Sequence, residues 1–399
     1  MVQLKAWLQR NLKGDPIIWA IIITLCVISI LVVYSSTGAL AYKKAGGDTE
    51  HFLRKHSVHI LLCLVAMWFA HKINYKYYSG LSKMALWLCI PLLLYGYIFG
   101  DNINDAMRSV TIPIINQSFR PSDFAKLALI AALARMLARR QDDIDDFKKT
   151  FLPMIAWCGG ICALIALSNF STSVMLFATC LLLMFIGRVP MKYLGMLLLV
   201  GIVLVPIGLK LGSRWDTTVN RIKNFSSDST VSFQAEQSYI ALATGGIIGK
   251  GPGNSDQRNF LPHSYSDFIY SIIVEEYGLV GGVFVLFLFL ALLYRGMIIV
   301  ARSDRPFGGL LSAGLSFSLV IQALIHMGVA VGLGPITGQP LPLLSMGGTS
   351  LLFTGISLGV ILSVSRGDIS EITKEDLKEN SAKDIIAKEE ENNVAKQSA

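Results

Sequence analysis

Long apolar runs, separated by short and mostly charged connections, dominate the sequence. A helix that crosses the hydrocarbon core of a bilayer needs about 20 predominantly apolar residues, and about ten runs meet this criterion. Only 16% of the residues are charged, against roughly a quarter in soluble domains. The sequence therefore predicts an all-α, polytopic integral membrane protein of about ten transmembrane helices. The spans are expected near residues 16–38, 54–71, 81–99, 122–138, 150–168, 171–187, 191–211, 267–294, 307–330 and 346–365.

The basic residues predict the orientation, because Lys and Arg are enriched in cytoplasmic loops. They precede the first run and recur in alternate connections, near residues 72–83, 135–149, 188–192 and 295–305. We therefore expect both termini in the cytoplasm. The opposite side receives the longer connections, of which the one between helices seven and eight, residues 212–266, is the largest. The glycine- and proline-rich connection 331–345 is expected to line a cavity.

The tail of the chain has a different character. After residue 366 the sequence is a mixed-charge run without a core-forming pattern, which is typical of disordered segments. We expect a transmembrane domain over 1–366 and a disordered cytoplasmic tail over 367–399. The formal net charge of +8 does not indicate nucleic-acid binding. The bases flank apolar spans, a pattern typical of topology signals and of contact with membrane lipid.

The stretch 249–278 holds the strongest functional signal. A polar, glycine-rich loop leads to Asp267, and the apolar helix behind it carries Glu275 and Glu276. An acid at the mouth of a membrane helix is costly to desolvate and is a functional candidate by default. Two interpretations of Asp267 carry equal weight, a cap on the following helix or a catalytic carboxylate. For at least one of the two glutamates, ion-paired helix packing is favoured.

A second polar group surrounds the start of the predicted fourth helix. Lys126 follows Asp123 by three residues, so the two side chains can pair on one helix face. With Arg108 and Arg120, these residues form either a helix start with an internal ion pair or a cationic pocket for a phosphate. His326 is expected to be a hydrogen-bonded core histidine rather than a proton relay.

Nucleotide-binding motifs are absent. Lys250 in the run GGIIGKGPGN is followed by glycine instead of Ser or Thr, so this run is not a phosphate-binding loop of the Walker type. The sequence also lacks GxGxxG in a βαβ setting. We therefore expect a substrate that arrives through the bilayer or from the side opposite the termini.

Three separated stretches, in order, resemble one known family. They are RPSDFAKLAL (120–129), GPGNSDQRNFLPHSYSDFIYSIIVEEYGLVG (251–281) and GPITGQPLPLLSMGGTSLL (334–352). They are similar to the SEDS proteins (shape, elongation, division and sporulation), and the run 251–255 favours the division branch over the elongation branch. The resemblance implies a peptidoglycan glycosyltransferase of the bacterial cytoplasmic (inner) membrane, placed at the division septum. Its substrate would be lipid II, the undecaprenyl-pyrophosphate-linked disaccharide peptide.

The resemblance also assigns roles to residues. Asp267 matches the family's essential acid, and Ser345, which falls in its last loop motif, is expected to bind substrate. Arg108, Asp123 and Lys126 match polar positions that line the family's central cavity. Glycosyl transfer from a pyrophosphate needs one base for the attacking hydroxyl and cations for the leaving group. Asp267 is therefore the expected base, with Arg108 and Lys126 as pyrophosphate stabilisers.

No cofactor is certain from the sequence. A divalent cation, Mg²⁺ or Mn²⁺, bridging Asp267 and the pyrophosphate fits the chemistry, but the sequence holds no metal cage. Two departures from the family pattern stand out. Tyr265-Ser266 replaces a usual His-Thr before the acid, and the segment 168–172, SNFST, lacks the family's acid.

The resemblance implies partners as well. They are a class B penicillin-binding protein, whose transpeptidase would cross-link the new glycan, and other division proteins. Three alternatives stay open: a flippase for lipid II, an elongation-type polymerase, and a non-enzymatic scaffold that recruits division proteins.

Overall fold

The computed structural model describes residues 13–38, 40, 48–103, 106–112, 117–211, 219–221, 225, 232–303 and 305–367. For the described residues within 101–118 and 202–211 it gives the backbone alone. The predicted tail over 367–399 lies outside the described residues apart from Gly367.

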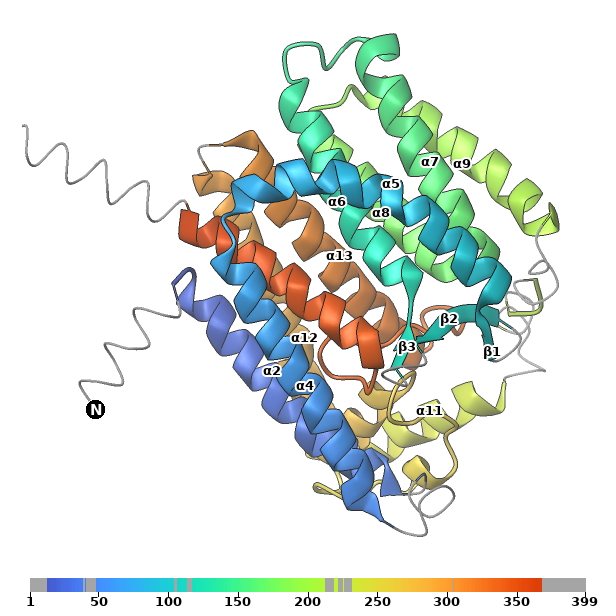
Figure 1. Ribbon diagram of the computed structural model, residues 1–399. Coiled ribbons are helices and arrows are strands. Elements are labelled where there is room, and N and C mark those ends of the chain that lie inside the picture. Colours follow the sequence, from blue (N-terminus) through green and yellow to red (C-terminus); the bar gives the residue numbers. More distant parts are fainter. Residues whose placement is uncertain are drawn as a thin grey trace, which may run out of the picture.

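Ten long helices form a bundle in the described part of the chain (Figure 1). Seven helical regions are long and apolar enough by themselves to cross a membrane, and α6, α8 and α9 complete the ten. The predicted all-α polytopic fold is confirmed. The helices are α2 (Pro16–Ser36), α4 (Thr49–Lys72), α5 (Tyr75–Phe99), α6 (Pro121–Arg139), α7 (Leu152–Ser168), α8 (Phe170–Ile186), α9 (Met191–Leu211), α12 (Ile269–Arg302), α13 (Pro306–Ala330) and the C-terminal helix Gly348–Gly367.

Short elements fill the connections. A π-helical turn (Phe147–Phe151) leads into α7. Helix α11 (Phe233–Gly245) precedes α12, and a 3-10 turn (Gln257–Asn259) lies between α11 and α12. The connection after α5 adds a feature that helix patterns do not predict, a small antiparallel sheet in the order β1-β2-β3. Its strands are β1 (Asp101–Ile103), β2 (Ala106–Ile112) and β3 (Gln117–Phe119).

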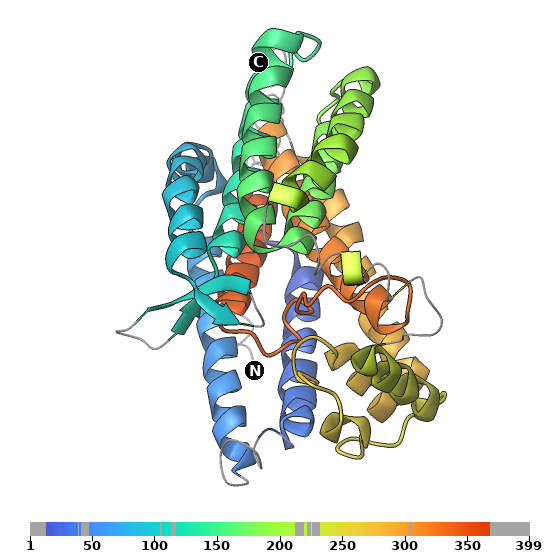
Figure 2. The ribbon, with the colours of Figure 1, turned by 90° about the vertical axis from the view of Figure 1, so that its right-hand side faces the viewer.

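The sheet has a simple local cause. Val110, Thr111 and Ile112 are β-branched residues, which favour strands, and Val110 pairs with Phe119 while Ile112 pairs with Gln117. The sheet, α11 and the loop 331–347 gather at one end of the bundle (Figures 1 and 2). The described chain ends meet at the opposite end, where Gly14 approaches Leu362 and Arg366. This pairing of the ends agrees with an even number of spans, and the cytoplasmic location of that end stays a prediction.

Close packing inside the bundle depends on small residues. A Cβ atom on Gly355 would lie 2.5 Å from the carbonyl oxygen of Cys63, and one on Gly359 would lie 2.3 Å from that of Met67. These two glycines, four residues apart, allow the C-terminal helix to approach the backbone of α4, as small residues do at membrane helix interfaces.

Two polar contacts fix α2 against α12 at either end. At the start of α2, Asp15 accepts a hydrogen bond from the backbone N–H of Ile17 and another, at 2.8 Å, from Nε of Arg295. At the other end, the hydroxyl of Ser35 donates to Glu276. Asp15 and Glu276 are almost fully buried, so each needs the partner that the neighbouring helix supplies.

Helix α12 is interrupted at Gly278, whose φ of 70° and ψ of −172° are open only to glycine. The interruption frees the carbonyls of Glu275 and Glu276, which accept hydrogen bonds from the N–H groups of Lys250 (3.0 Å) and Gly251 (2.9 Å). Irregular backbone in a membrane helix persists only where such partners satisfy it. The break therefore attaches the loop after α11 to the spanning helix.

Candidate active site

Asp267 lies in the turn directly before α12 and is partly exposed. The cap of α12 is Phe268, and no side chain makes a capping hydrogen bond there. The capping interpretation of Asp267 is therefore wrong. Its backbone N–H donates to the carbonyl of His263 at 3.0 Å, and its Oδ1 accepts a hydrogen bond from the hydroxyl of Ser266 at 3.1 Å. The carboxylate is held in place with capacity for further partners.

Three side chains lie within the electrostatic reach of Asp267. Burial lowers the pKa of Arg221, and the charge of Asp267 acts in the opposite direction. The pKa of Tyr265 is raised by burial and by the same charge. The charge also acts on His326 of α13. Asp267 thus lies within electrostatic range of a guanidinium, which is an arrangement suited to an anionic substrate.

Arg221 was not identified from the sequence. It belongs to a short helical turn, residues 219–221, in the long connection before α11, and its Nη1 donates to the carbonyl of Ile336 at 3.2 Å. In the sequence it is one of several basic residues in the long connection 212–266, and nothing local distinguishes it from the others. Its proximity to Asp267 depends on tertiary contacts across more than a hundred residues.

The segment 339–345 connects the Asp267 turn to α13. The Ser345 hydroxyl donates to the carbonyl of Ser266 at 2.6 Å and accepts from the N–H of Leu341 at 2.8 Å. Ser345 is only 1% exposed. The structure thus places this predicted substrate-binding residue behind the Asp267 turn, where it positions the turn.

Two side chains of α13 hold the same segment from the other side. Gln322 donates to the carbonyl of Pro340 at 2.8 Å, and His326 Nδ1 lies 2.7 Å from the carbonyl of Gln339. His326 is 2% exposed, which confirms the predicted hydrogen-bonded core histidine. Because a carbonyl only accepts, Nδ1 carries the proton and Nε2 is left as an acceptor.

The predicted pair of Asp123 and Lys126 is confirmed, with a distance of 2.9 Å between Nζ and Oδ1. Lys126 also donates to Oε1 of Gln322 at 3.2 Å. Asp123 is 7% exposed, and its Oδ2 has no hydrogen-bond partner among the described residues. A buried carboxylate oxygen without a partner is costly, so this oxygen is available to a ligand group.

Two pockets meet at Asp123. One is polar and includes Asn169, which caps α8 at the position where the family resemblance loses an acid. The other runs among α6, α13 and the C-terminal helix and is lined by both polar and apolar side chains. The polar pocket is lined by Arg120, Ser122, Asp123, Ser168, Asn169, Thr172 and Gln339, and the other by Asp123, Lys126, Leu127, Ile130, Leu315, Ser318, Leu319, Gln322, Ser350, Phe353, Thr354 and Ser357.

Arg108, the remaining predicted site residue, belongs to strand β2. Its side chain lies outside the described part of the structure, so its role stays a prediction. Asp123, Lys126, Ser345 and Asp267 are linked through Gln322 and the segment 339–345.

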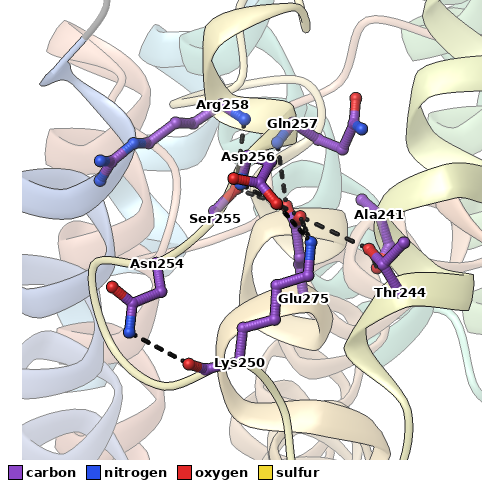
Figure 3. A network of polar contacts seen from close by, with 9 residues as sticks. All are labelled: Ala241, Thr244, Lys250, Asn254, Ser255, Asp256, Gln257, Arg258 and Glu275. Atoms are coloured by element: carbon purple, nitrogen blue, oxygen red, sulfur yellow. Dashed lines mark hydrogen bonds and ion pairs between the residues drawn. The ribbon is translucent and has the colours of Figure 1, made fainter.

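Glu275 has a different role from Asp267. Its fully buried carboxylate accepts hydrogen bonds from Lys250 Nζ at 2.7 Å, from the N–H groups of Asp256 (3.2 Å) and Gln257 (3.3 Å), and from the Ser255 hydroxyl (Figure 3). The ion pair predicted for at least one of the two glutamates is confirmed, and it joins α12 to a loop instead of to another helix. Glu275 therefore organises the loop 250–258.

The sequence profile of the FtsW/RodA/SpoVE cell cycle protein family matches residues 16–369. The chain belongs to this family. It is 32% identical over 365 residues to a probable peptidoglycan glycosyltransferase FtsW of Geobacter metallireducens, which covers 89% of this chain and 96% of the relative. It is 31% identical over 358 residues to the stage V sporulation protein E of Bacillus subtilis, with coverages of 88% and 97%.

The fold of this chain is also similar to that of two solved structures. A chain of a peptidoglycan synthase complex, described as coordinating polymerization and crosslinking, has a TM-score of 0.70 at 24% identity and covers 89% of this chain and 98% of its own length. The rod shape determining protein RodA of Thermus thermophilus has a TM-score of 0.63 at 23% identity, with coverages of 88% and 97%. Family membership confirms the resemblance inferred from the three sequence stretches.

Proposed function

We propose that this peptidoglycan glycosyltransferase of the FtsW/RodA/SpoVE family polymerises lipid II into glycan strands during septal cell-wall synthesis. Curated relatives at 30–32% identity are named as probable peptidoglycan glycosyltransferases of the FtsW type. The observation that carries the mechanism is the environment of Asp267. This carboxylate is partly exposed, makes no capping hydrogen bond to its helix, and lies within electrostatic range of Arg221.

The reaction joins the 4-hydroxyl oxygen of one sugar to the anomeric carbon of another. The bond between that carbon and the pyrophosphate oxygen breaks, and undecaprenyl pyrophosphate leaves with the electron pair. Asp267 accepts the hydroxyl proton, a role that contributes about 10²–10⁴-fold in rate. The leaving group is already a stable anion, so it needs cations instead of a general acid. Lys126, Arg221 and the predicted Arg108 supply them.

The two pockets at Asp123 suit an amphiphilic substrate. The polar pocket offers the free carboxylate oxygen and amide groups to sugar hydroxyls, and the mixed pocket adds Leu127, Ile130 and Phe353, which can contact the start of a hydrocarbon chain. The Asp123–Lys126 pair lies at their junction, where a pyrophosphate would join head and tail. Sharing Lys126 between Asp123 and Gln322 keeps the cation in place when no substrate is bound.

A divalent cation fits this site only as a partner of the substrate. Among the described residues, no three His, Cys, Asp or Glu side chains gather to hold a metal. Mg²⁺ often takes one or two carboxylates and completes its shell with phosphate oxygens and water. Asp267 would supply the carboxylate, and the ion would neutralise charge on the pyrophosphate.

We propose a class B penicillin-binding protein as the partner, in a complex placed at the septum with other division proteins. Crosslinking of new strands requires a transpeptidase, and this chain is similar to one from a structure titled as coordinating polymerization and crosslinking.

The test is polymerisation of labelled lipid II in liposomes by the purified protein with its cognate partner, for wild type and Asp267→Ala. We expect glycan from the wild type and none from a folded variant. Product from both proteins would place the base elsewhere. No product from either, while lipid II still crosses the bilayer, would replace the polymerase with a flippase.

A further inference from the structure

Two consecutive isoleucines project from the tight turn after α11. Ile247 and Ile248 are 70% and 84% exposed. The turn is bound to the break in α12, because the carbonyls of Gly246 and Ile247 accept hydrogen bonds from the N–H groups of Leu279 (2.9 Å) and Val280 (3.3 Å). The isoleucine pair therefore lies against the side of a membrane-spanning helix, and its depth in the bilayer can be determined.

The depth of the pair follows from the length of α2 between its two polar contacts with α12. Asp15, at its start, contacts Arg295, and Ser35, at its end, contacts Glu276. The two contacts are roughly 20 residues apart along α2, or about 30 Å at 1.5 Å per residue. This length equals the thickness of the hydrocarbon core. Because α2 is apolar between its ends, Glu276 lies at the edge of the core opposite the chain ends. Gly278 and the turn bound to it lie at the same edge.

The isoleucines continue an apolar stripe that is exposed along α12. Along α12, Leu279, Val283, Phe287 and Leu290 recur at intervals of three and four residues and are 56%, 52%, 61% and 43% exposed. Such a stripe on a spanning helix is in contact with acyl chains. The attachment of Ile247 beside Val280 places the pair at the edge of this stripe. On the other side of the turn lies the polar loop, in which Lys250 forms an ion pair with Asp256.

Part of the backbone of the turn is already hydrogen-bonded. The carbonyls of Gly246 and Ile247 are satisfied by α12, and the N–H of Gly249 donates to the carbonyl of Gly245 at 2.9 Å. In hydrocarbon, each unsatisfied backbone group would cost several kcal/mol. The turn is thus anchored to α12, and its remaining N–H groups place its backbone at the hydrated edge of the core while the two isoleucine side chains point to the apolar side.

We propose that Ile247 and Ile248 insert into the bilayer edge and are covered by the acyl chains of surrounding lipid. The inserted pair holds the loop 250–267 at a fixed height above the hydrocarbon core. Asp267, at the end of that loop, is thereby kept at the level of the lipid headgroups. This inference is independent of the reaction assigned to the site.

The test places a nitroxide on Ile248→Cys in purified protein reconstituted in liposomes, with Asn259→Cys and Leu290→Cys as controls. Asn259 is an exposed polar residue of the same loop, and Leu290 lies on the lipid-facing stripe. The six native cysteines are buried, so the introduced thiol is the reactive one, and labelling of the wild type measures the background. Collisions with oxygen report lipid, and collisions with a nickel chelate report water.

We expect the ratio of oxygen to nickel accessibility at position 248 to resemble that at 290 and to exceed that at 259 several-fold. A ratio equal to that at 259 would overturn the proposal. Protection from both reagents at 248 would also overturn it, because a second protein copy would then cover the pair. Ile247→Cys provides the same measurement if the first variant does not fold.

Discussion

Asp267 and Glu275 lie eight residues apart, yet their surroundings are opposite. Asp267 is partly exposed, and the single hydrogen bond from the Ser266 hydroxyl leaves its oxygens room for further partners. Glu275 is fully buried, and both of its oxygens are occupied by the loop 250–258. A carboxylate with unoccupied oxygens can accept a proton from a substrate. A carboxylate whose oxygens are all hydrogen-bonded to a loop keeps that loop in place instead. The two neighbouring acids are therefore suited to different roles, Asp267 to catalysis and Glu275 to holding the loop 250–258.

The largest expected effect comes from Asp267→Asn. The amide has the same shape and keeps the hydrogen bond from Ser266, but it cannot accept the hydroxyl proton. Glycan synthesis from lipid II should fall by about 10²–10⁴-fold. The melting temperature should stay unchanged, because no buried charge pair is broken. A folded variant that retains wild-type rates would show that another group accepts the hydroxyl proton.

Gly278→Ala should cause the next largest effect, on stability. The backbone conformation at Gly278 excludes other residues, and the added Cβ would lie 2.1 Å from the carbonyl oxygen of Ile247. Such strain costs about 1–3 kcal/mol before any clash. Thermal unfolding of the purified protein measures the loss. Gly159→Ala, with nothing within 4 Å of its Cβ, is the matched control and should not lower the melting temperature.

Glu275→Gln should loosen the loop that Glu275 organises. The substitution removes the charge that faces Lys250 and replaces one acceptor oxygen with a donor, so at least one buried N–H or O–H group loses its partner. Each lost partner costs about 1–3 kcal/mol. Hydrogen exchange of residues 250–258 should accelerate, with a smaller loss of glycan synthesis than in Asp267→Asn. Unchanged exchange would show that the loop is held by its other contacts.

The sequence predicted the bundle well, because apolar length and the positions of Lys and Arg are local signals. It also placed Lys126 beside Asp123, since their spacing puts both on one helix face. It did not distinguish capping from catalysis at Asp267, because that depends on where α12 begins. Nor did it identify Arg221 or the positioning role of Ser345, whose contacts join segments more than seventy residues apart.

The smallest effect concerns the exposed arm of the Glu275 network, the pair of Lys250 and Asp256. Lys250 lowers the pKa of Asp256, and Asp256 followed by Glu275 raises the pKa of Lys250. The carboxylate therefore contributes stability above its unfolded pKa of about 4, which is lost as the pH falls through its lower folded value. The ammonium contributes below its unfolded pKa of about 10.4, and this contribution is lost as the pH rises through its higher folded value.

Between those limits, Asp256→Asn should lower the melting temperature by a small and constant amount, because exposed ion pairs are weak. The difference from wild type should shrink toward acid pH, where Asp256 is protonated in both the folded and the unfolded chain. Melting curves of the two proteins from pH 3 to 9 test this expectation. A difference that grows toward acid would mean that Asp256 destabilises the loop, and Glu275 alone would then be the anion that holds Lys250.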